Sequence, residues 1–482
     1  MTMLRTNAEV DTSIPLVVDL DGTLICADLL HESTLGLLRQ DPIAALRMPW
    51  WLQRGRAALK HEIAQRVTLD VETLPYHTGL LEWLKTQRAA GRRLVLCTAS
   101  NERYAQQVAA HLALFDEVIA SDATVNVSAQ RKAQMLVARF GAKGFDYAGN
   151  SADDLQVWPH ARKAIVVNAK SSVAAEARQR FEVAAAWPPV RAGARGLLRA
   201  MRVHQWMKNL LLLLPLAGAY QLGDVHLLGQ AFVAFLAFGL CASSVYVLND
   251  LMDLASDRAH PRKRLRPFAS GLLSVPQGLV FSAVLLAGSV VLALASRPAF
   301  QAALALYFAM TLAYTFVLKQ RVIVDCVTLG GLYTIRIVAG WCAVGLPPSF
   351  WLLAFSLFLF LSLAFVKRFS ELQLMVKMGR AETRGRGYIA SDLPIVLSMG
   401  IAAGFGSVLL LALYINGDTV LRSYTRLELL WCTVPVHLYW VSRMWMQAQR
   451  GNMHDDPVVF ALRDWQSVAC GALFVLALGL AR

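Results

Sequence analysis

Residues 249–267 read NDLMDLASDRAHPRKRLRP and follow directly on a long apolar run. Spacings of three and four place Asp250, Asp253 and Asp257 on one face of a predicted helix. Three carboxylates on one face repel each other unless a cation neutralises them, and such oxygen ligands suit Mg²⁺ held together with substrate phosphates. The alternative is a solvated acidic loop. The basic residues that would meet such a phosphate follow at once: Lys263, Arg264 and Arg266.

The chain around this stretch is too apolar for a soluble protein of its length. Of its 482 residues, 56% are hydrophobic and 17% are charged, against about 25% charged in typical soluble domains. Residues 1–195 have an ordinary soluble composition, whereas almost everything after Leu210 lies in long apolar blocks. The composition predicts a soluble N-terminal part joined to an all-α polytopic membrane part.

Apolar segments of about 20 residues, the length that spans a bilayer as a helix, recur along the second part. Most Lys and Arg residues between them fall in alternate loops, which the positive-inside rule places in the cytoplasm. Because no signal peptide opens the chain, we expect a cytoplasmic N-terminal domain, an inner-membrane location and a C-terminus on the opposite side. The segments predict about nine transmembrane helices: 209–226, 228–248, 272–295, 299–317, 322–345, 348–366, 392–415, 427–446 and 464–481.

The net charge of +14 has two interpretations. Nucleic-acid binding is one, but basic loops between membrane spans are the simpler cause, so no nucleic-acid partner is expected. The seven cysteines form no CxxC pair and no Cys/His metal spacing. Neither a disulfide framework nor a thiolate metal site is therefore expected.

Further polar side chains at the ends of the predicted spans, or inside them, are candidate substrate ligands: Lys208, Asn209, Lys319, Arg321, Asp325, Arg336, Lys367 and Arg368. Arg336 falls inside the fifth span, where a charge is costly and usually faces a polar cavity. The first pair could instead belong to an amphipathic helix that leads into the membrane. The last pair could be a plain positive-inside anchor.

The motif NDLMDLASD at residues 249–257 resembles the first aspartate-rich motif, NDxxDxxxD, of the UbiA superfamily of intramembrane prenyltransferases. The resemblance covers residues 195–482 and implies that the motif binds Mg²⁺ and a diphosphate. It assigns the catalytic role to Asp250 and Asp253. The residues that it implies as ligands are Asn249 for the substrate and Asp250, Asp253 and Asp257 for the metal.

The second motif of that superfamily, DxxxD, is incomplete here, because Asp325 is followed four residues later by Leu329. Arg336, the HQWMKN segment and the KRFSEL segment resemble instead one branch, the decaprenyl-phosphate phosphoribosyltransferases. This resemblance implies transfer of 5-phosphoribosyl from phosphoribosyl diphosphate to polyprenyl phosphate, with positioning and electrostatics supplying most of the acceleration. The segment Asp455–Asp464 also resembles this branch, and its role stays unassigned.

The soluble part begins with IPLVVDLDGTL at residues 14–24, a buried-strand pattern that ends in two carboxylates and a glycine turn. Asp19 and Asp21 point the same way at the strand end, so one can attack phosphorus while the other exchanges the proton. Thr98 and Ser100 end the next apolar run with hydroxyls that could bind phosphate. Strands that alternate with helical stretches predict an α/β fold with a Rossmann-type parallel sheet and a site at its carboxyl edge.

These stretches, with Lys132 and with FDYAGNSADD at residues 145–154, resemble in order the four motifs of the haloacid dehalogenase (HAD) phosphatase superfamily over residues 14–185. The last motif is commonly GDxxxD, and Asn150 stands here in place of its first aspartate. An amide is a weaker Mg²⁺ ligand, which Asp153 or Asp154 could offset; a degenerate, structural domain is the alternative. The resemblance implies a nucleophile, an acid/base, a phosphate-binding hydroxyl and a charge stabiliser at Asp19, Asp21, Thr98 and Lys132, and Mg²⁺ ligands at Asp19, Asp21, Asn150 and Asp154.

The expected organisation is a HAD-like phosphatase domain at 1–190 with a small helical cap at about 28–75, a linker and amphipathic helix at 191–208, and a UbiA-like transmembrane domain at 209–482. With Mg²⁺ in both domains, the leading hypothesis is a bifunctional enzyme. It would transfer phosphoribosyl from phosphoribosyl diphosphate to a polyprenyl phosphate lipid and then remove the 5-phosphate. An ordinary aromatic prenyltransferase and a non-catalytic lipid-binding scaffold stay open as alternatives, as does a homo-oligomer.

Overall fold

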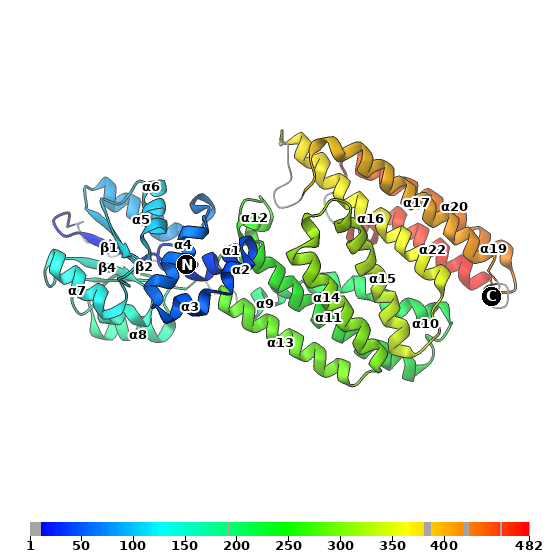
Figure 1. Ribbon diagram of the computed structural model, residues 1–482, viewed down its shortest axis with the longest axis horizontal. Coiled ribbons are helices and arrows are strands. Elements are labelled where there is room, and N and C mark those ends of the chain that lie inside the picture. Colours follow the sequence, from blue (N-terminus) through cyan, green and yellow to red (C-terminus); the bar gives the residue numbers. More distant parts are fainter. Residues whose placement is uncertain are drawn as a thin grey trace. The chain divides into compact units, whose positions relative to one another are not determined.

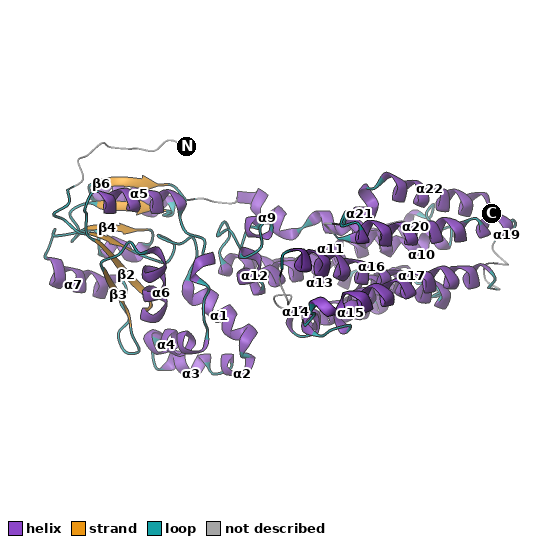
Figure 2. Cartoon of the chain, turned by 90° about the horizontal axis from the view of Figure 1, so that it is seen from above, coloured by secondary structure: helices purple, strands orange, loops and turns teal. Residues whose placement is uncertain are grey.

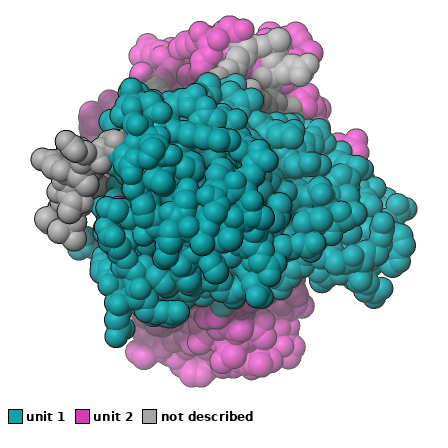
Figure 3. All heavy atoms as spheres, turned by 90° about the vertical axis from the view of Figure 1, so that its left-hand side faces the viewer, with its two compact units in different colours: residues 1–201, 246–281 teal, residues 202–245, 282–482 magenta. Residues whose placement is uncertain are grey.

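The computed structural model describes residues 11–189, 193–379, 387–417, 420, 424–453 and 456–481. The chain forms two compact units, coloured separately in Figure 3: residues 1–201 with 246–281, and residues 202–245 with 282–482. The aspartate-rich stretch therefore belongs to the same compact unit as the predicted phosphatase domain. Residues 191 and 192 of the predicted linker lie outside the described residues.

The first unit is built on a six-stranded parallel sheet with the order β3-β2-β1-β4-β5-β6. The strand order reverses at β1, where the register pairs Leu16 with Leu94 of β2 and with Asp146 of β4. In open parallel sheets, ligands bind at the carboxyl ends of the strands beside such a switch point. The strands are β1 Leu16–Val18, β2 Leu94–Asn101, β3 Glu117–Ser121, β4 Asp146–Gly149, β5 Ala164–Val167 and β6 Val183–Trp187.

Helices on both faces cover the sheet, which is why β1, β2 and β4 are almost fully buried. Successive strand residues point to opposite faces, so Leu16 and Val18 join one apolar core while Val17 joins the other. The predicted Rossmann-type domain is confirmed. Its main helices are α5 Thr78–Ala89, α6 Glu102–Leu112, α7 Ala129–Phe140 and α8 Ser171–Arg180, with a 3₁₀ turn η2 at Ala152–Gln156.

The segment between the first two strands is helical and forms a separate group beside the sheet (Figure 2). Its core contains Leu37, Trp51, Leu59, Ile63 and Val67. We refer to helices α1–α4 as the cap. They are α1 Leu29–Gln40, α2 Pro42–Ala45, α3 Met48–Gln53 and α4 Arg56–Arg66, followed by the turn η1 at Val71–Thr73.

The membrane part consists of helices only, among the residues described. In the second unit α15 packs between α14 and α16, and α16 runs along α17 (Figure 1). The long helices are α11 Val225–Met252, α13 Val275–Leu294, α14 Pro298–Phe316, α15 Val324–Val344, α16 Phe350–Lys377 and α17 Leu393–Ile415, the last continuous with η6 Ala390–Asp392. The shorter elements are α9 Gly193–Met201, η3 Val203–Leu213, α10 Leu214–Gly218, α12 Leu254–Arg258, η4 Lys263–Leu265, η5 Leu318–Gln320, α19 Leu427–Trp431, α20 Thr433–Gln449, α21 Pro457–Arg463 and α22 Trp465–Leu480.

All nine predicted apolar segments contain helical residues, but not every segment forms a single helix long enough to cross a membrane. Among the described residues, six helices are long and apolar enough to cross a membrane, or seven if α21 and α22, bent by 82°, form one span. The first predicted span, 209–226, is instead divided between η3 and α10, with Pro215 at the start of α10. In the segment 427–446, α19 ends at Trp431 and α20 has only 17 residues. The chain is a multi-pass membrane protein with about the predicted number of helices.

Candidate functional site

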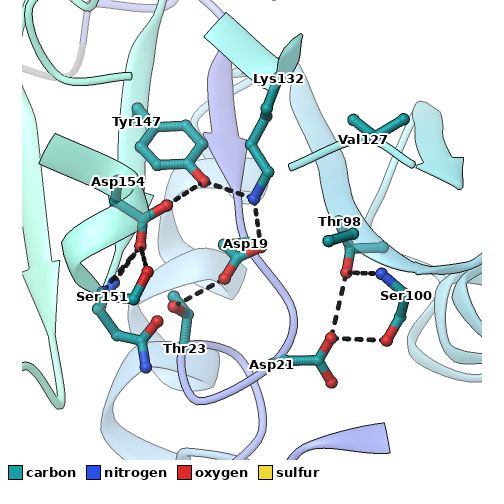
Figure 4. A network of polar contacts seen from close by, with 12 residues as sticks. Asp19, Asp21, Thr23, Thr98, Ser100, Val127, Lys132, Tyr147, Ser151 and Asp154 are labelled. Carbon is teal, nitrogen blue, oxygen red and sulfur yellow. Dashed lines mark hydrogen bonds and ion pairs between the residues drawn. The ribbon is translucent and has the colours of Figure 1, made fainter. Parts of the chain in front are cut away.

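The carboxyl ends of β1, β2 and β4 bring together the predicted phosphatase residues (Figure 4). Asp19 follows β1 and is 7% exposed. Thr98 and Ser100 lie on β2 and are buried. Lys132, from α7, is 5% exposed although a lysine side chain is rarely buried without a partner. Residues far apart in the sequence thus converge at the predicted edge of the sheet.

A chain of hydrogen bonds links the predicted nucleophile to the fourth motif (Figure 4). The Lys132 Nζ donates to Asp19 Oδ1 at 2.7 Å and contacts the Tyr147 hydroxyl at 2.9 Å. That hydroxyl donates to Asp154 Oδ1 at 2.7 Å, and Asp154 Oδ2 accepts from the backbone N–H groups of Asn150 and Ser151 at 2.9 and 2.8 Å. Asp154 therefore holds the loop after β4 and orients the lysine through Tyr147.

Burial controls the protonation of this cluster. It raises the pKa of Asp19 to about 6, since the attraction of Lys132 only partly offsets the loss of water and the repulsion from Asp154. Burial opposes the charge on Lys132, but Asp19 and Asp154 together raise the pKa of its ammonium above the usual value. Near neutral pH the arrangement is an ionised carboxylate against an ammonium, as a nucleophile for phosphorus requires.

Asp21 lies in a different environment from Asp19. Its Oδ2 accepts from the Ser100 hydroxyl at 2.6 Å and from the Thr98 hydroxyl at 3.4 Å, and its Oδ1 accepts from the backbone N–H of Leu29 at 2.8 Å. Burial raises the pKa of Asp21 to about 7, with further repulsion from Asp28. A carboxyl group with a pKa near 7 can both donate and accept a proton at neutral pH, which fits the predicted acid/base.

The residues fit the magnesium ion that the HAD resemblance implies. Gly22 has φ +73°, and a Cβ built on it would lie 2.1 Å from Asn150 Nδ2, so the Asn150 amide rests directly on the Asp19–Asp21 turn. An amide oxygen and a carboxylate are hard oxygen ligands of the kind Mg²⁺ takes. Among the described residues no three His, Cys, Asp or Glu side chains converge as metal ligands. The predicted ligands Asp19, Asp21 and Asp154 thus do not meet at one point in this structure: Asp21 accepts from Ser100 and Asp154 holds the loop after β4. Backbone oxygen, phosphate or water would complete the set of ligands.

Lys60 of the cap also reaches this site, although no sequence motif predicts it as a site residue. Its Nζ donates to the backbone carbonyl of Ala99, between the two hydroxyl residues of β2, at 2.6 Å and to Asn126 Oδ1 at 3.0 Å. Burial lowers the pKa of Lys60, while Asp21 and Asp28 favour its charged form. Lys60 lies on α4, which carries no recognisable motif, so its place in the site is visible only in the folded structure.

In the aspartate-rich stretch, Arg266 brings two of the three predicted carboxylates together. Its Nη1 lies 2.6 Å from Asp257 Oδ2 and 3.2 Å from Asp250 Oδ1. Asp250 and Asp257 are 2% and 3% exposed, so both are buried around one positive charge. Two buried carboxylates that converge on a cation, with oxygen ligands only, fit the magnesium ion implied by the UbiA resemblance.

The third carboxylate, Asp253, lies at a break between two helices. α11 ends at Met252, and Asp253 precedes α12 with its backbone N–H still bonded to the carbonyl of Asn249. The Asp253 carboxylate lies 3.9 Å from Arg39 of the cap. Lys263 and Arg264, which we predict as phosphate ligands, are on the exposed turn η4.

Inside the first unit, the cap and the aspartate-rich stretch are joined by buried contacts. Arg258 donates two hydrogen bonds to the Glu32 carboxylate, Nη1 to Oε2 at 2.7 Å and Nη2 to Oε1 at 2.6 Å, and its Nε donates to the carbonyl of Ala269 at 3.0 Å. A Cβ built on Gly271, where φ is +76°, would lie 2.6 Å from the carbonyl oxygen of Cys26. Arg258 directly follows Asp257, so the predicted metal segment and the phosphatase cap form one packed body.

In the second unit, Lys208 and Arg336 meet around one tyrosine. Lys208 Nζ lies 2.5 Å from Asp456 Oδ2 and 5.3 Å from the Tyr333 ring centroid, and the Tyr333 hydroxyl donates to Asp456 at 3.3 Å. Through Asp456, the segment Asp455–Asp464 contacts one of the predicted substrate ligands, Lys208. Asp455 lies outside the described residues.

Arg336 is 4% exposed inside α15 and is surrounded by aromatic rings. Its guanidinium lies 5.0 Å from the Tyr307 ring centroid and 5.5 Å from those of Phe238 and Tyr333. It donates to Asn209 Oδ1 and to the Tyr307 hydroxyl, both at 3.1 Å. Arg336 thus contacts Asn209 of the HQWMKN segment directly, and the surrounding aromatic rings stabilise its charge.

Asp325, the carboxylate of the incomplete second motif, is paired with an arginine. Its Oδ2 lies 2.5 Å from Arg368 Nη2, with both side chains fully buried, and its Oδ1 accepts from the Tyr388 hydroxyl at 2.6 Å. Arg368 also donates to Glu371. Two of the predicted substrate ligands, Asp325 and Arg368, therefore bind each other. Of the other predicted ligands, Lys319 is buried, Lys367 is half-buried and Arg321 is exposed.

Fold and site define a multi-pass membrane enzyme that carries a phosphatase-like domain with a parallel sheet. The UbiA prenyltransferase family model matches residues 210–468, more than half of the chain, and the chain belongs to this family. The haloacid dehalogenase-like hydrolase model matches residues 16–158, in agreement with the parallel-sheet domain.

Three relatives are similar to this chain over different shares of its length. The uncharacterized protein y4nM of Sinorhizobium fredii is 36% identical over 97% of this chain and 91% of its own length. The nodulation protein NoeC of Azorhizobium caulinodans is 38% identical over 58% of this chain and 91% of its own. The decaprenyl-phosphate phosphoribosyltransferase of Mycobacterium tuberculosis is 36% identical over 43% of this chain and 70% of its own.

Proposed function

We propose that the chain is a bifunctional enzyme that makes a polyprenyl-phosphoryl ribose. Its UbiA-type part transfers 5-phosphoribosyl from phosphoribosyl diphosphate to polyprenyl phosphate, and its HAD-type part removes the 5-phosphate. The observation that carries the proposal is that a phosphatase-type site and an aspartate-rich diphosphate motif share one compact unit, tied by Arg258 and Glu32. The similarity to a decaprenyl-phosphate phosphoribosyltransferase supports the choice of donor and acceptor.

In the first reaction an oxygen of the lipid phosphate attacks the anomeric carbon of the donor. The bond from that carbon to the diphosphate breaks, and diphosphate leaves with the electron pair. No general base is needed, because the attacking phosphate oxygen is already ionised. Bound Mg²⁺, held by Asp250 and Asp257 together with diphosphate oxygens, would neutralise the charge that develops on the diphosphate, and Asp253 stays a candidate third ligand. Arg266 adds a fixed positive charge between Asp250 and Asp257.

The pairing of Asp325 with Arg368 supports a sugar diphosphate as donor over a prenyl diphosphate. A second metal bound through the DxxxD motif needs two carboxylates, yet Leu329 replaces one, and Arg368 neutralises the other. Lys208 and Arg336, which Asp456 and Asn209 contact, would bind the phosphates of the lipid or the donor in this proposal. Lys319, Arg321 and Lys367 stay candidates for the same role.

In the second reaction Asp19 attacks phosphorus of the ribose 5-phosphate. A phospho-aspartate forms, and the ribose oxygen leaves with the proton of Asp21. Water then attacks the phospho-aspartate while Asp21 takes up a proton, which releases inorganic phosphate and restores both carboxyl groups. Thr98 and Ser100 would bind phosphate oxygens, and Lys132 stabilises their charge. Mg²⁺ bound at Asp19 and Asn150 would supply further charge neutralisation there.

Both reactions take place at the cytoplasmic side of the inner membrane in this proposal. The distribution of Lys and Arg between the spans supports a cytoplasmic N-terminal domain, where phosphoribosyl diphosphate is dissolved. The C-terminus would then lie on the opposite side.

Purified protein in lipid nanodiscs, incubated with Mg²⁺, polyprenyl phosphate and radiolabelled phosphoribosyl diphosphate, tests the proposal. We expect a labelled lipid that contains ribose, and none from an Asp250→Asn variant. A parallel incubation with a prenyl diphosphate and an aromatic acid tests the alternative. Prenylated product with no labelled lipid would establish an ordinary prenyltransferase and reject the phosphoribosyl transfer.

A further inference from the structure

Two short cap helices, α2 and α3, lie at the outer edge of the cap (Figure 2). Large apolar side chains on and beside them are exposed. Ile43, Leu46, Trp50 and Leu52 are 73%, 80%, 58% and 51% exposed. These four residues lie within ten positions of one another, and we call them the apolar patch. Isolated exposed apolar residues are ordinary, but a group of them on a soluble domain marks a surface that binds something.

The apolar patch is not the result of loose packing. The opposite side of the same helices, with Ala44, Ala45 and Trp51, is buried in the core of the cap. Both helices begin with proline in the first turn, and Asp41 caps α2 through a hydrogen bond from the backbone N–H of Ala44 at 2.9 Å. The cap therefore holds the apolar patch outward on a fixed backbone.

Positive charge predominates beside the patch, with Asp41 at the start of α2 and Glu62, 3.5 Å from Arg54, as the neighbouring acidic residues. The segment from residue 42 to residue 56 contains Arg47, Arg54 and Arg56 and no acidic residue, and all three arginines are exposed. The Arg54 guanidinium lies 5.3 Å from the centroid of the Trp50 ring. Surfaces that lie in the headgroup region of anionic membranes typically combine tryptophan and aliphatic side chains with neighbouring arginines.

We propose that this face of the cap binds the surface of the bilayer that holds the chain's own transmembrane helices, through anionic lipid headgroups. The charge favours lipid over a second copy of this chain, because arginines that face arginines across a symmetric contact would repel. The tether favours it too, since a domain attached to membrane spans meets the bilayer at a high effective concentration, so a weak surface suffices. The inference does not depend on which reaction either site performs.

Photo-crosslinking of the full chain in nanodiscs tests the inference. The nanodiscs contain phosphatidylglycerol and phosphatidylethanolamine with a trace of a phospholipid carrying a diazirine near its headgroup, and peptide mass spectrometry locates the adducts. We expect adducts on residues 42–56 at roughly ten times the yield on α8. This helix serves as the internal control because it exposes no large apolar side chain. Replacing phosphatidylglycerol by phosphatidylcholine should reduce the yield on residues 42–56.

A variant with Ile43, Leu46, Trp50 and Leu52 all changed to serine should lose these adducts and keep those on the transmembrane helices. Met135→Ser on α7, an exposed apolar residue away from the cap, is the matched control and should change nothing. Thermal unfolding of the quadruple variant must match the wild type for the comparison to hold, and single Leu46→Ser and Trp50→Ser variants replace it otherwise. Adducts on residues 42–56 no more frequent than on α8, or crosslinks from the patch to a second copy of the chain, would overturn the inference.

Discussion

Replacing Lys132 by methionine tests the phosphatase site most sharply, because it removes one charge and keeps the volume of the side chain. The ammonium lies 2.7 Å from Asp19 and 2.9 Å from the Tyr147 hydroxyl, and is 5% exposed. Removing one partner of a buried ion pair costs about 3–5 kcal/mol when the other charge stays. Asp19 can avoid that cost by binding a proton. The loss of its partner therefore raises the pKa of Asp19.

At about 1.4 kcal/mol per pKa unit, 3 kcal/mol corresponds to about two units. The pKa of Asp19 lies at about 6 with the lysine present, so its carboxyl would be mostly protonated at pH 7 in the variant. The nucleophile must be ionised, so hydrolysis at pH 7 should fall about tenfold for this reason alone, and about a further 100-fold because the transition state loses a positive charge.

Initial rates of phosphate-ester hydrolysis between pH 5 and 9 provide the measurement. In the wild type the rate should rise through about pH 6 as Asp19 ionises, and in Lys132→Met this rise should move to higher pH by about two units. Lys85→Met, which removes a lysine whose side chain is 54% exposed on α5, is the control and should leave the profile unchanged. A rate lowered by the same factor at every pH, with the rise still near pH 6, would refute the electrostatic role of Lys132.

Three further predictions address single contacts. Asp21→Asn should abolish hydrolysis yet raise the unfolding temperature at pH 8. The folded-state pKa of Asp21 is about 7, above its ordinary 3.8, so ionisation of this carboxyl opposes folding increasingly from about pH 4 to 7. The increase in unfolding temperature should therefore vanish at pH 4. Arg258→Met or Glu32→Leu should each destabilise the first unit by about 3–5 kcal/mol, and the double variant by much less, as thermal unfolding would show; additive losses would mean that the two residues act separately. Asp250→Asn should abolish the heat protection that phosphoribosyl diphosphate gives in Mg²⁺, and unchanged protection would place the donor elsewhere.

The parts of the structure that the sequence predicts well are those encoded by contiguous residues. Asp19 and Asp21 follow a buried run within one short stretch, so their place at a strand end needs no knowledge of the rest of the chain. Asp250 and Asp257 also come from one short stretch and meet at Arg266, but the helix breaks at Asp253. They therefore lie on α11 and α12 and not on the single helical face that their spacing predicts.

Contacts between distant residues could not be predicted. Glu32 and Arg258 are 226 residues apart, and neither belongs to a periodic pattern that marks it as buried. Asp456 and Lys208 likewise lie in different segments, so the partner of the lysine emerges only from the packing of α21 against the start of the membrane part.

The broken first span shows a different limit. Hydropathy measures composition, and the segment 209–226 is apolar enough to span a bilayer. It does not become one long helix, because η3 has 3₁₀ geometry up to Leu213 and α10 ends at Gly218. The buried polar pair Lys208 and Asn209 lies in that 3₁₀ segment, close to Arg336 and Asp456. The 3₁₀ geometry thus coincides with polar contacts of Lys208 and Asn209, and an average of hydropathy along the sequence does not register such contacts.

The most direct test of a two-step enzyme compares the lipid products of the wild type and of Asp19→Asn, with phosphoribosyl diphosphate labelled in its ribose. Lipid extracts separated by thin-layer chromatography distinguish a ribosyl lipid with a 5-phosphate from one without it. We expect the wild type to accumulate the lipid without phosphate and Asp19→Asn to accumulate the phosphorylated lipid at an unchanged rate of transfer. Identical products from the two proteins would contradict the phosphatase step, and no labelled lipid from either would contradict the transfer itself.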